Sequence, residues 1–170
     1  MANKSSKTVY LVQSAVIAAL YAALTYLVSP LSYGVTQFRF SEALTILPVF
    51  TPAAIPGLAI GCLISNIGSP FGLADLFFGT FATLISAILT RISRNFLFKK
   101  IPIVSPIFPV ILNGIFVGIE FCFFVEKSAT FSLFCATFLS VALGELVVCY
   151  LLGIPLYFGI KKTGILKGGE

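Results

Sequence analysis

Histidine is absent from the 170-residue sequence, and acidic residues are scarce, with six Asp and Glu in total. No stretch matches a G-x-x-x-x-G-K-[ST] phosphate-binding loop, a paired-aspartate site or a metal-ligand cluster. The chain by itself therefore cannot hydrolyse ATP or carry out histidine-based acid–base chemistry. We expect a protein that is not an enzyme and that has no cofactor and no metal site.

Charged residues of either sign are also rare, at 10% of the chain, while 58% of the residues are hydrophobic and the mean hydropathy is +1.06. A soluble domain carries about a quarter charged residues and just under half apolar ones. This composition therefore predicts an integral membrane protein. Because about 20 apolar residues span a bilayer, the chain has room for about six spans joined by short loops, as one membrane domain over residues 1–170.

The four cysteines lie within apolar runs and show no C-x-x-C spacing. They are Cys62, Cys122, Cys135 and Cys149. We interpret them as thiols packed between helices rather than as metal ligands or disulfide partners.

Apolar runs bounded by Pro, Gly and charged residues predict an all-α bundle of six transmembrane helices. The helices are expected at about residues 8–28, 41–50, 52–66, 73–92, 103–125 and 130–158. The first run follows Lys4 and Lys7, as in a signal peptide. We expect it to be a retained helix, because it is longer than a signal h-region and no small-x-small cleavage site ends it.

The basic residues predict the orientation of this bundle, because Lys and Arg accumulate in cytoplasmic loops. With six spans and both termini in the cytoplasm, nine of the 11 basic residues lie inside the cell: Lys4, Lys7, Arg91, Arg94, Lys99, Lys100, Lys161, Lys162 and Lys167. Arg39 and Lys127 lie outside. We therefore expect a multi-pass protein of the cell membrane that contacts lipid, and the net charge of +5 requires no nucleic acid to explain it.

Small residues form a stripe along the first expected helix, at Ala15, Ala19 and Ala23. Such stripes let membrane helices approach each other closely, so this one fits either packing inside the bundle or contact with a partner protein. The same spacing recurs in the third and fifth helices, at Gly57, Gly61 and Ser65 and at Gly114, Gly118 and Cys122. There we expect packing inside the bundle.

Polar side chains within the spans are the candidate binding residues, because an acid at a helix centre costs about 2.5–3.5 kcal/mol on the insertion scale. Asp75 and Glu42 open their helices and could instead favour the helix N-termini, and Arg39 with Glu42 could be an exposed ion pair. Glu120 and Glu145 have no helix terminus to stabilise, so they predict a binding or pairing role. The candidates are Arg39, Glu42, Asn66, Asp75, Asn113, Glu120 and Glu145.

Three blocks of sequence make the chain similar to a known family. They are QFRFSEALTILPVFTPAAIPGLAIGCLISN (37–66), DLFFGTFATL (75–84) and GELVVCYLLGIPL (144–156). The chain resembles the QueT family, the substrate-binding S components of energy-coupling factor (ECF) transporters that are assigned to queuosine precursors. The match is weaker at the turn over residues 68–72 and at residues 102–109.

The resemblance implies a six-helix protein that captures a small molecule near the outer face, beneath the loop between its first two helices. It also implies association with a membrane scaffold subunit and two cytoplasmic ABC-type ATPases, which explains why no nucleotide site occurs in this chain. An A-x-x-x-A face on the first helix docks on the scaffold in this family. Ala15 with Ala19, or Ala19 with Ala23, match that face.

The ligand implied by the resemblance is a 7-deazaguanine such as 7-cyano- or 7-aminomethyl-7-deazaguanine. Its guanine-type edge presents two adjacent N–H donors, for which the carboxylate of Glu145 or Glu120 is a matched acceptor. Asn113 and Asn66 could add donors and acceptors, while Arg39 and Glu42 of the first loop could close the site. Two other functions stay open: a stand-alone proton-coupled carrier that relays protons through Glu120 and Glu145, and a membrane-embedded enzyme.

Overall fold

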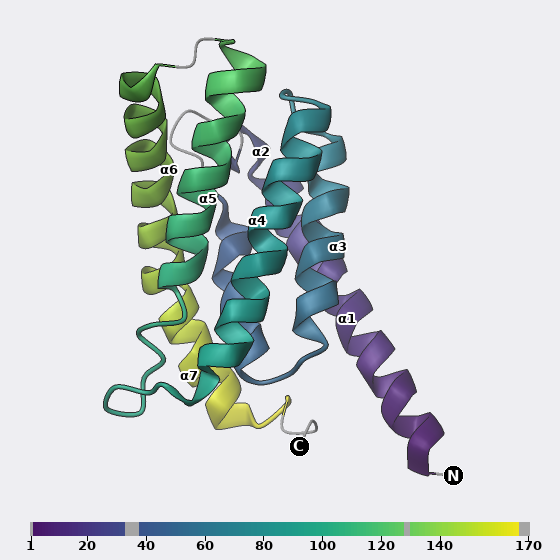
Figure 1. The fold of residues 1–170 in the computed structure, drawn as a ribbon. Coiled ribbons are helices and arrows are strands. Elements are labelled where there is room, and N and C mark those ends of the chain that lie inside the picture. The colour runs from purple at the N-terminus through teal and green to yellow at the C-terminus, as the bar shows by residue number, and fades with distance from the viewer. Residues whose placement is uncertain (1, 33–37, 128–129, 167–170) are drawn as a thin grey trace.

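The computed structural model describes residues 2–32, 38–127 and 130–166, and these residues form an all-helical bundle (Figure 1). The elements are α1 (Ala2–Leu27), α2 (Ser29–Ser32), the 3-10 helix η1 (Phe40–Val49), α3 (Ala54–Ile67), α4 (Leu73–Ile92), the short 3-10 turn η2 (Ser93–Asn95), α5 (Ile107–Glu120), its π-helical continuation η3 (Phe121–Val125), α6 (Phe131–Leu151) and α7 (Gly153–Thr163). The described residues contain no β-strand beyond one isolated bridge, between Phe98 and Ile101.

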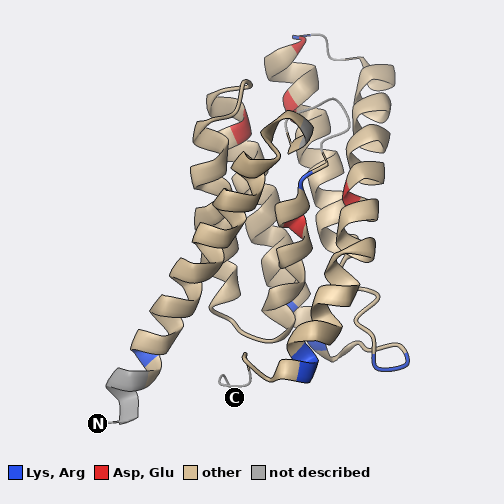
Figure 2. Ribbon diagram, turned by 180° about the vertical axis from the view of Figure 1, so that it is seen from behind, with Lys and Arg blue, Asp and Glu red and all other residues tan. Residues whose placement is uncertain are grey.

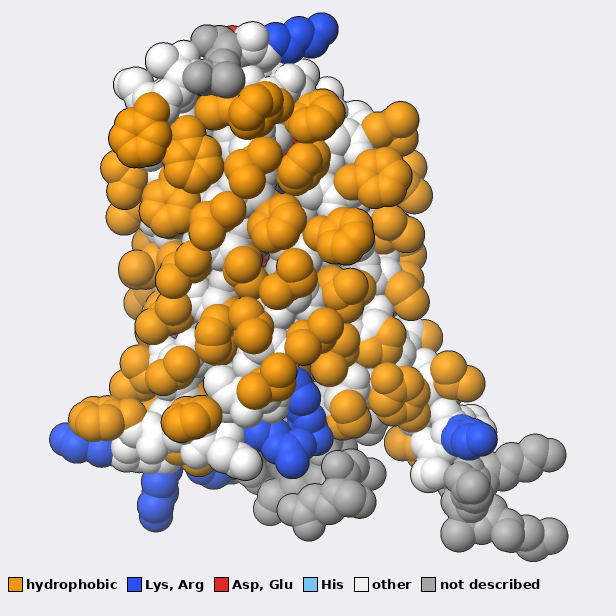
Figure 3. All heavy atoms as spheres, viewed as in Figure 1, with side chains coloured by type: hydrophobic (Ala, Val, Ile, Leu, Met, Phe, Trp, Pro, Cys, Tyr) orange, Lys and Arg blue, Asp and Glu red, His pale blue; other side chains and the backbone are white. Residues whose placement is uncertain are grey.

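Four segments are long and apolar enough to cross a membrane. They are Ser6–Leu27, Leu73–Asn95, Ile107–Val125 and Phe131–Thr163, while η1 and α3 are shorter apolar helices. Hydrophobic side chains cover the lateral face of the bundle that Figure 3 shows, and charged side chains gather at its ends. The prediction of an all-α integral membrane bundle is confirmed.

The η1 segment is the central element of the bundle, in contact with α1, α3, α4, α6 and α7. It was expected as a short helix at residues 41–50, and the structure makes it a 3-10 helix with Pro48 inside it. A 3-10 helix rises about 2.0 Å per residue against 1.5 Å for an α-helix, so ten residues extend about 20 Å rather than about 15 Å. The tighter winding lets this short segment reach further across the bundle.

The last expected helix, at residues 130–158, is broken in the structure. It divides at Leu152 into α6 and α7, and α7 continues to Thr163. Pro155 explains the break, since proline has no N–H to donate to the carbonyl of Leu151 and its ring clashes with that carbonyl. The fifth helix likewise begins at Ile107 rather than at residue 103, directly after Pro106.

The glycine stripes of α3 and α5 pack against other helices of the bundle, as predicted. A Cβ atom on Gly61 would lie 2.7 Å from the Cβ of Tyr21, so α3 and α1 are in close backbone contact there. A Cβ atom on Gly114 would lie 2.8 Å from the ring of Phe138 in α6. Small residues therefore set the close approach of both helix pairs.

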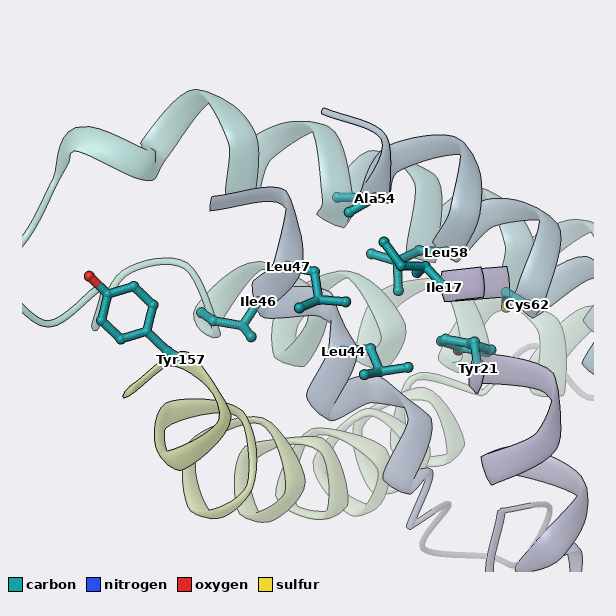
Figure 4. Packing of buried hydrophobic residues seen from close by; sticks show 10 residues of the cluster. Ile17, Tyr21, Leu44, Ile46, Leu47, Ala54, Leu58, Cys62 and Tyr157 are labelled. Carbon is teal, nitrogen blue, oxygen red and sulfur yellow. The ribbon is translucent and has the colours of Figure 1, made fainter. Parts of the chain in front are cut away.

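A buried apolar cluster packs residues of η1 against the neighbouring helices (Figure 4). It joins α1, η1, α3 and α7 through Ile17, Tyr21, Leu44, Ile46, Leu47, Ala54, Leu58, Cys62 and Tyr157. The cluster fixes η1, and with it Glu42, between the longer helices.

Charge is distributed unevenly along the bundle (Figure 2). Acidic residues lie toward the end opposite the start of α1 and the end of α7, and most Lys and Arg residues lie toward the same end as the start of α1 and the end of α7. Of the basic residues expected on the cytoplasmic side, Lys167 lies outside the described residues. The arrangement matches the asymmetry on which the predicted orientation rests.

Candidate functional site

All seven candidate binding residues are buried, and each exposes 5% or less of its surface. They come from η1 and the residue before it, and from α3, α4, α5 and α6: Arg39, Glu42, Asn66, Asp75, Asn113, Glu120 and Glu145. Polar groups held inside an apolar bundle must find partners in one another or in a ligand.

An ion pair and an amide form the first part of the cluster. Arg39 Nη2 lies 3.3 Å from Asp75 Oδ2, and both side chains are buried. Asn66 Nδ2 donates to the backbone oxygen of Asp75 at 2.9 Å. The alternative of an exposed ion pair between Arg39 and Glu42 is therefore wrong, because Arg39 turns inward to α4.

Gly79 makes this arrangement possible, one helical turn after Asp75. A Cβ atom there would lie 2.6 Å from Asn66 Nδ2 and 3.1 Å from Asp75 Oδ1. A contact shorter than 3 Å to a buried side chain would force the amide away. Glycine at this position thus allows Asn66 and Asp75 to meet against the α4 backbone.

Glu42 is held by two hydroxyl groups from neighbouring helices. The Tyr21 hydroxyl of α1 donates a hydrogen bond to Glu42 Oε1, and Thr83 Oγ1 of α4 lies 3.5 Å from the same oxygen. Thr83 also lies 3.3 Å from the Cys62 sulfur. These contacts place the Glu42 carboxylate between α1, α3 and α4.

Glu145 has partners for both of its carboxylate oxygens. Asn113 Nδ2 of α5 donates to Glu145 Oε1 at 2.9 Å, and the Cys149 thiol donates to Glu145 Oε2 at 3.5 Å. Cys149 Sγ also lies 3.7 Å from the backbone oxygen of Glu42. The contact joins α5 and α6 and brings Glu145 close to η1.

Several acceptors of the cluster have no hydrogen-bond partner among the described residues. Both carboxylate oxygens of Glu120 are unsatisfied, as are Glu42 Oε2, Asp75 Oδ1 and Asn66 Oδ1. A buried acceptor left without a donor costs about 1–3 kcal/mol, and more when it is charged. Such a concentration of unsatisfied acceptors is the chemical complement of a ligand rich in N–H donors.

The α4 helix turns small side chains toward the interior of the bundle. Its buried face consists of small or polar residues, namely Asp75, Gly79, Ala82, Thr83, Ser86, Ala87 and Thr90. Within the part of the chain that the structure describes, Ser86 Oγ and the nearby Thr80 Oγ1 also have no hydrogen-bond partner. The interior side of α4 is therefore polar along most of its length.

Sequence reasoning missed four contributors: Tyr21, Gly79, Thr83 and Cys149. The sequence held a signal for Tyr21, because the spacing of Ser14, Tyr21 and Thr25 puts three polar residues on one face of a helix. The structure buries all three. Cys149 was assigned to packing alone, and it is a free buried thiol that also contacts Glu145. Residues 33–37 of the loop after the first helix lie outside the described residues.

The alanine stripe of α1 faces away from the bundle. Ala15, Ala19 and Ala23 are exposed, whereas Ala18 and Ala22 are buried. Figure 1 shows that the N-terminal part of α1 extends away from the other helices. Packing of the stripe inside the bundle is therefore wrong for this structure.

Comparisons with known proteins place the chain in a family. Residues 11–162 match the family described as QueT transporter. The protein described as "Queuosine precursor transporter QueT" from Lactococcus lactis subsp. cremoris (strain MG1363) is 43% identical over 84 residues, which are 48% of this chain and 49% of that relative. The match thus spans about half the length of the relative, and no solved structure matches the chain. Because the family match extends over nearly the whole chain and includes every candidate residue of the buried cluster, the protein belongs to the QueT transporter family.

Proposed function

We propose that this protein is the substrate-binding S component of an ECF-type ABC transporter that imports a queuosine precursor. The substrate is a 7-deazaguanine, and the energy comes from ATP hydrolysis by partner subunits. The name of the Lactococcus relative supports the substrate class. The observation that carries the proposal is the buried cluster of unsatisfied acceptors around Glu120 and Glu42.

The chemistry of a guanine-type edge fits these acceptors. Its two adjacent N–H groups match the two oxygens of a carboxylate, as in bidentate recognition of guanine. Glu145 already accepts hydrogen bonds from Asn113 and Cys149, whereas Glu120 accepts none from the described residues. We therefore favour Glu120 over Glu145 as a ligand acceptor, with the unsatisfied oxygens of Glu42, Asp75 and Asn66 as further contacts.

The exposed alanine stripe supports a docking role for α1. Ala15, Ala19 and Ala23 form a narrow face that the bundle leaves uncovered, and such a face allows close contact with a scaffold helix in lipid. In this proposal both termini are cytoplasmic, next to the ATPases, and the acidic cluster lies toward the outer leaflet. The charge distribution in Figure 2 supports that orientation.

Ligand binding by purified protein tests the proposal. Calorimetry with 7-aminomethyl- and 7-cyano-7-deazaguanine should give saturable binding of at least one compound. Glu120→Gln keeps the size but replaces an acceptor oxygen with a donor, so affinity should fall about ten- to a hundredfold, the equivalent of about 1.5–3 kcal/mol. Glu126→Gln is the matched control, because Glu126 is exposed just after η3 and its loss should leave affinity unchanged.

Two results would contradict the proposal. Normal ligand affinity of the Glu120→Gln variant would show that this carboxylate does not contact the ligand. Substrate uptake into liposomes by this protein alone, without ATPase partners, would favour the stand-alone carrier that uses Glu120 and Glu145. Native mass spectrometry of protein purified from cells would identify a retained deazapurine directly.

A further inference from the structure

The chain between α4 and α5 folds into a tight hairpin. Phe98 and Ile101 form an isolated antiparallel bridge, in which each backbone N–H donates to the carbonyl oxygen of the other residue at 2.9 Å. Lys99 and Lys100 form the two-residue turn between them, and their φ angles are 49° and 68°. Positive φ at both central residues is typical of a type I′ turn, where Asn-Gly is a preferred pair. Lysine rarely adopts this backbone conformation, so local sequence preference does not explain the two lysines at the turn.

Two tyrosine hydroxyls hold the hairpin against the bundle. Tyr150 of α6 donates to the backbone oxygen of Ile103 at 2.8 Å, and Tyr157 of α7 donates to that of Lys100 at 3.4 Å. Tyr157 is buried, and its hydroxyl accepts a hydrogen bond from Lys161 Nζ at 3.3 Å. The turn is therefore fixed in place by α6 and α7, and Lys161 lies beside it.

The side chains of this basic hairpin (residues 96–104) are largely exposed. Lys99 and Lys100 are exposed, and within the part of the chain that the structure describes no carboxylate pairs with them or with Lys161. Five apolar side chains of the hairpin are exposed as well: Phe96, Leu97, Phe98, Ile103 and Val104. At the lower left of Figure 3, where Figure 1 places this loop, basic side chains extend beyond hydrophobic ones. The basic hairpin therefore presents cations at its tip and apolar side chains next to them.

An anionic phospholipid matches both parts of this surface. Its phosphate supplies the negative charge that the lysines lack as a partner, and its acyl chains cover apolar side chains that water solvates poorly. A bilayer leaflet has charge outside and hydrocarbon inside, which is the order of the side chains on the hairpin. Lys99 Nζ lies 5.7 Å from the centroid of the Phe98 ring, so the cation and the ring are close enough to contact one lipid molecule.

We propose that the basic hairpin is a binding site for the headgroup of an anionic phospholipid. Lys99 and Lys100 contact the headgroup phosphate, and Phe96 and Phe98 lie at the boundary between headgroups and acyl chains. Because the two tyrosine hydroxyls already hold the turn, little conformational freedom of the backbone is lost when the lipid binds. The inference requires only a membrane bundle, so it is independent of the proposed substrate and partner subunits.

Native mass spectrometry of the purified full-length protein tests this site. The protein is titrated in detergent with phosphatidylglycerol or with phosphatidylcholine of the same acyl chains, and dissociation constants are obtained from the bound fractions. Each lysine near an anionic headgroup should contribute about fivefold in affinity. We therefore expect phosphatidylglycerol to bind at least about 25-fold more tightly than phosphatidylcholine, because two lysines contribute.

The double variant Lys99→Asn, Lys100→Gly removes both charges and keeps the turn. Asn-Gly is favoured in a type I′ turn, so the variant should retain or exceed the thermal stability of the unmodified protein. Its affinity for phosphatidylglycerol should fall about 25-fold, while its affinity for phosphatidylcholine should not change. Measuring thermal stability in parallel separates a loss of lipid selectivity from a loss of folding.

Lys127→Gln is the matched control for the single variant Lys99→Gln. Lys127 is also exposed and also has a φ of 49°, but it follows η3 at the opposite end of the bundle (Figure 1). Both substitutions remove one positive charge. Lys99→Gln should lower the preference for phosphatidylglycerol about fivefold, whereas Lys127→Gln should leave it unchanged.

Several results would overturn the inference. Equal affinity of the unmodified protein for the two lipids, or binding of neither, would show that it has no site for an anionic headgroup. A preference that the double variant retains would show that the hairpin is not that site, and loss of co-purification with partner subunits in the same variant would make it a protein-docking surface instead. An equal loss in Lys127→Gln and Lys99→Gln would assign the effect to net charge.

Deazaguanine binding distinguishes this inference from the proposed function. The double variant should bind these compounds as the unmodified protein does, because none of the candidate substrate-binding residues belongs to the hairpin. Failure of the unmodified protein to bind any deazaguanine would refute the proposed function and leave the lipid site standing.

Discussion

Replacing Tyr21 by Phe should destabilise the bundle by removing one oxygen atom from its interior. Tyr21 is fully buried in α1, and its hydroxyl donates a hydrogen bond to Glu42 Oε1. The ring of Phe keeps the packing of Tyr21 against α3 and η1. The substitution therefore isolates the hydrogen bond from the apolar contacts.

The expected magnitude follows from what Glu42 retains. Without the Tyr21 hydroxyl, its carboxylate keeps Thr83 Oγ1 at 3.5 Å, a weak contact, and Oε2 is already unsatisfied. Hydrogen bonds to charged groups contribute about 1.5–3 kcal/mol, so we expect the free energy of unfolding to fall by about that amount. Ligand affinity should fall as well, because Glu42 loses the contact that orients it.

Tyr26→Phe is a matched control on the same helix. Its hydroxyl donates to the backbone oxygen of Ile64 at 2.7 Å, and the residue is exposed. Neutral contacts between membrane helices average about 0.6 kcal/mol, so the control should cost much less than Tyr21→Phe. Unfolding of both variants in detergent–SDS mixtures gives the comparison. Equal losses, or a loss below about 0.6 kcal/mol for Tyr21→Phe, would refute the anchoring of Glu42 by Tyr21.

Three other predictions test the packing, the docking face and the orientation. Gly61→Ala should lower the free energy of unfolding by about 1–3 kcal/mol in the same assay, because the added Cβ would lie 2.8 Å from a backbone oxygen of α1. An unchanged free energy of unfolding would contradict the close contact of α1 and α3. Ala19→Leu should leave ligand binding intact but abolish co-purification with the scaffold and ATPases, whereas Ala22→Leu, at a buried position, should lower stability. Retained assembly of Ala19→Leu would refute the docking role. In sealed cells a membrane-impermeant maleimide should label Lys127→Cys and spare Lys99→Cys, and labelling at position 99 would refute the proposed orientation.

The architecture followed largely from local sequence. In lipid, the backbone N–H and C=O groups of such long apolar runs can form their hydrogen bonds within the run only if it is helical. Hydropathy alone therefore predicted a helical membrane bundle. The fourth helix was expected at residues 73–92, and α4 has these bounds. The 3-10 winding of η1 was not predictable in this way, because it depends on the contacts that surround the segment on all sides. The break at Leu152 was signalled by Pro155 and was overlooked within a long apolar run.

The sequence by itself determined which acids and amides would form the buried polar cluster, because such groups inside apolar helices are too costly to face lipid. It did not identify Tyr21, Thr83 and Cys149, which also contact the cluster. Only the tertiary structure decided how they pair. Arg39 pairs with Asp75 rather than with Glu42, three residues away, because the chain at Arg39 turns its guanidinium toward α4. The rotation of α1 in the same way decided that Ala18 and Ala22 are buried and that Ala15, Ala19 and Ala23 face outward. Both outcomes depend on contacts between residues far apart in the chain, and local composition and spacing do not determine those contacts.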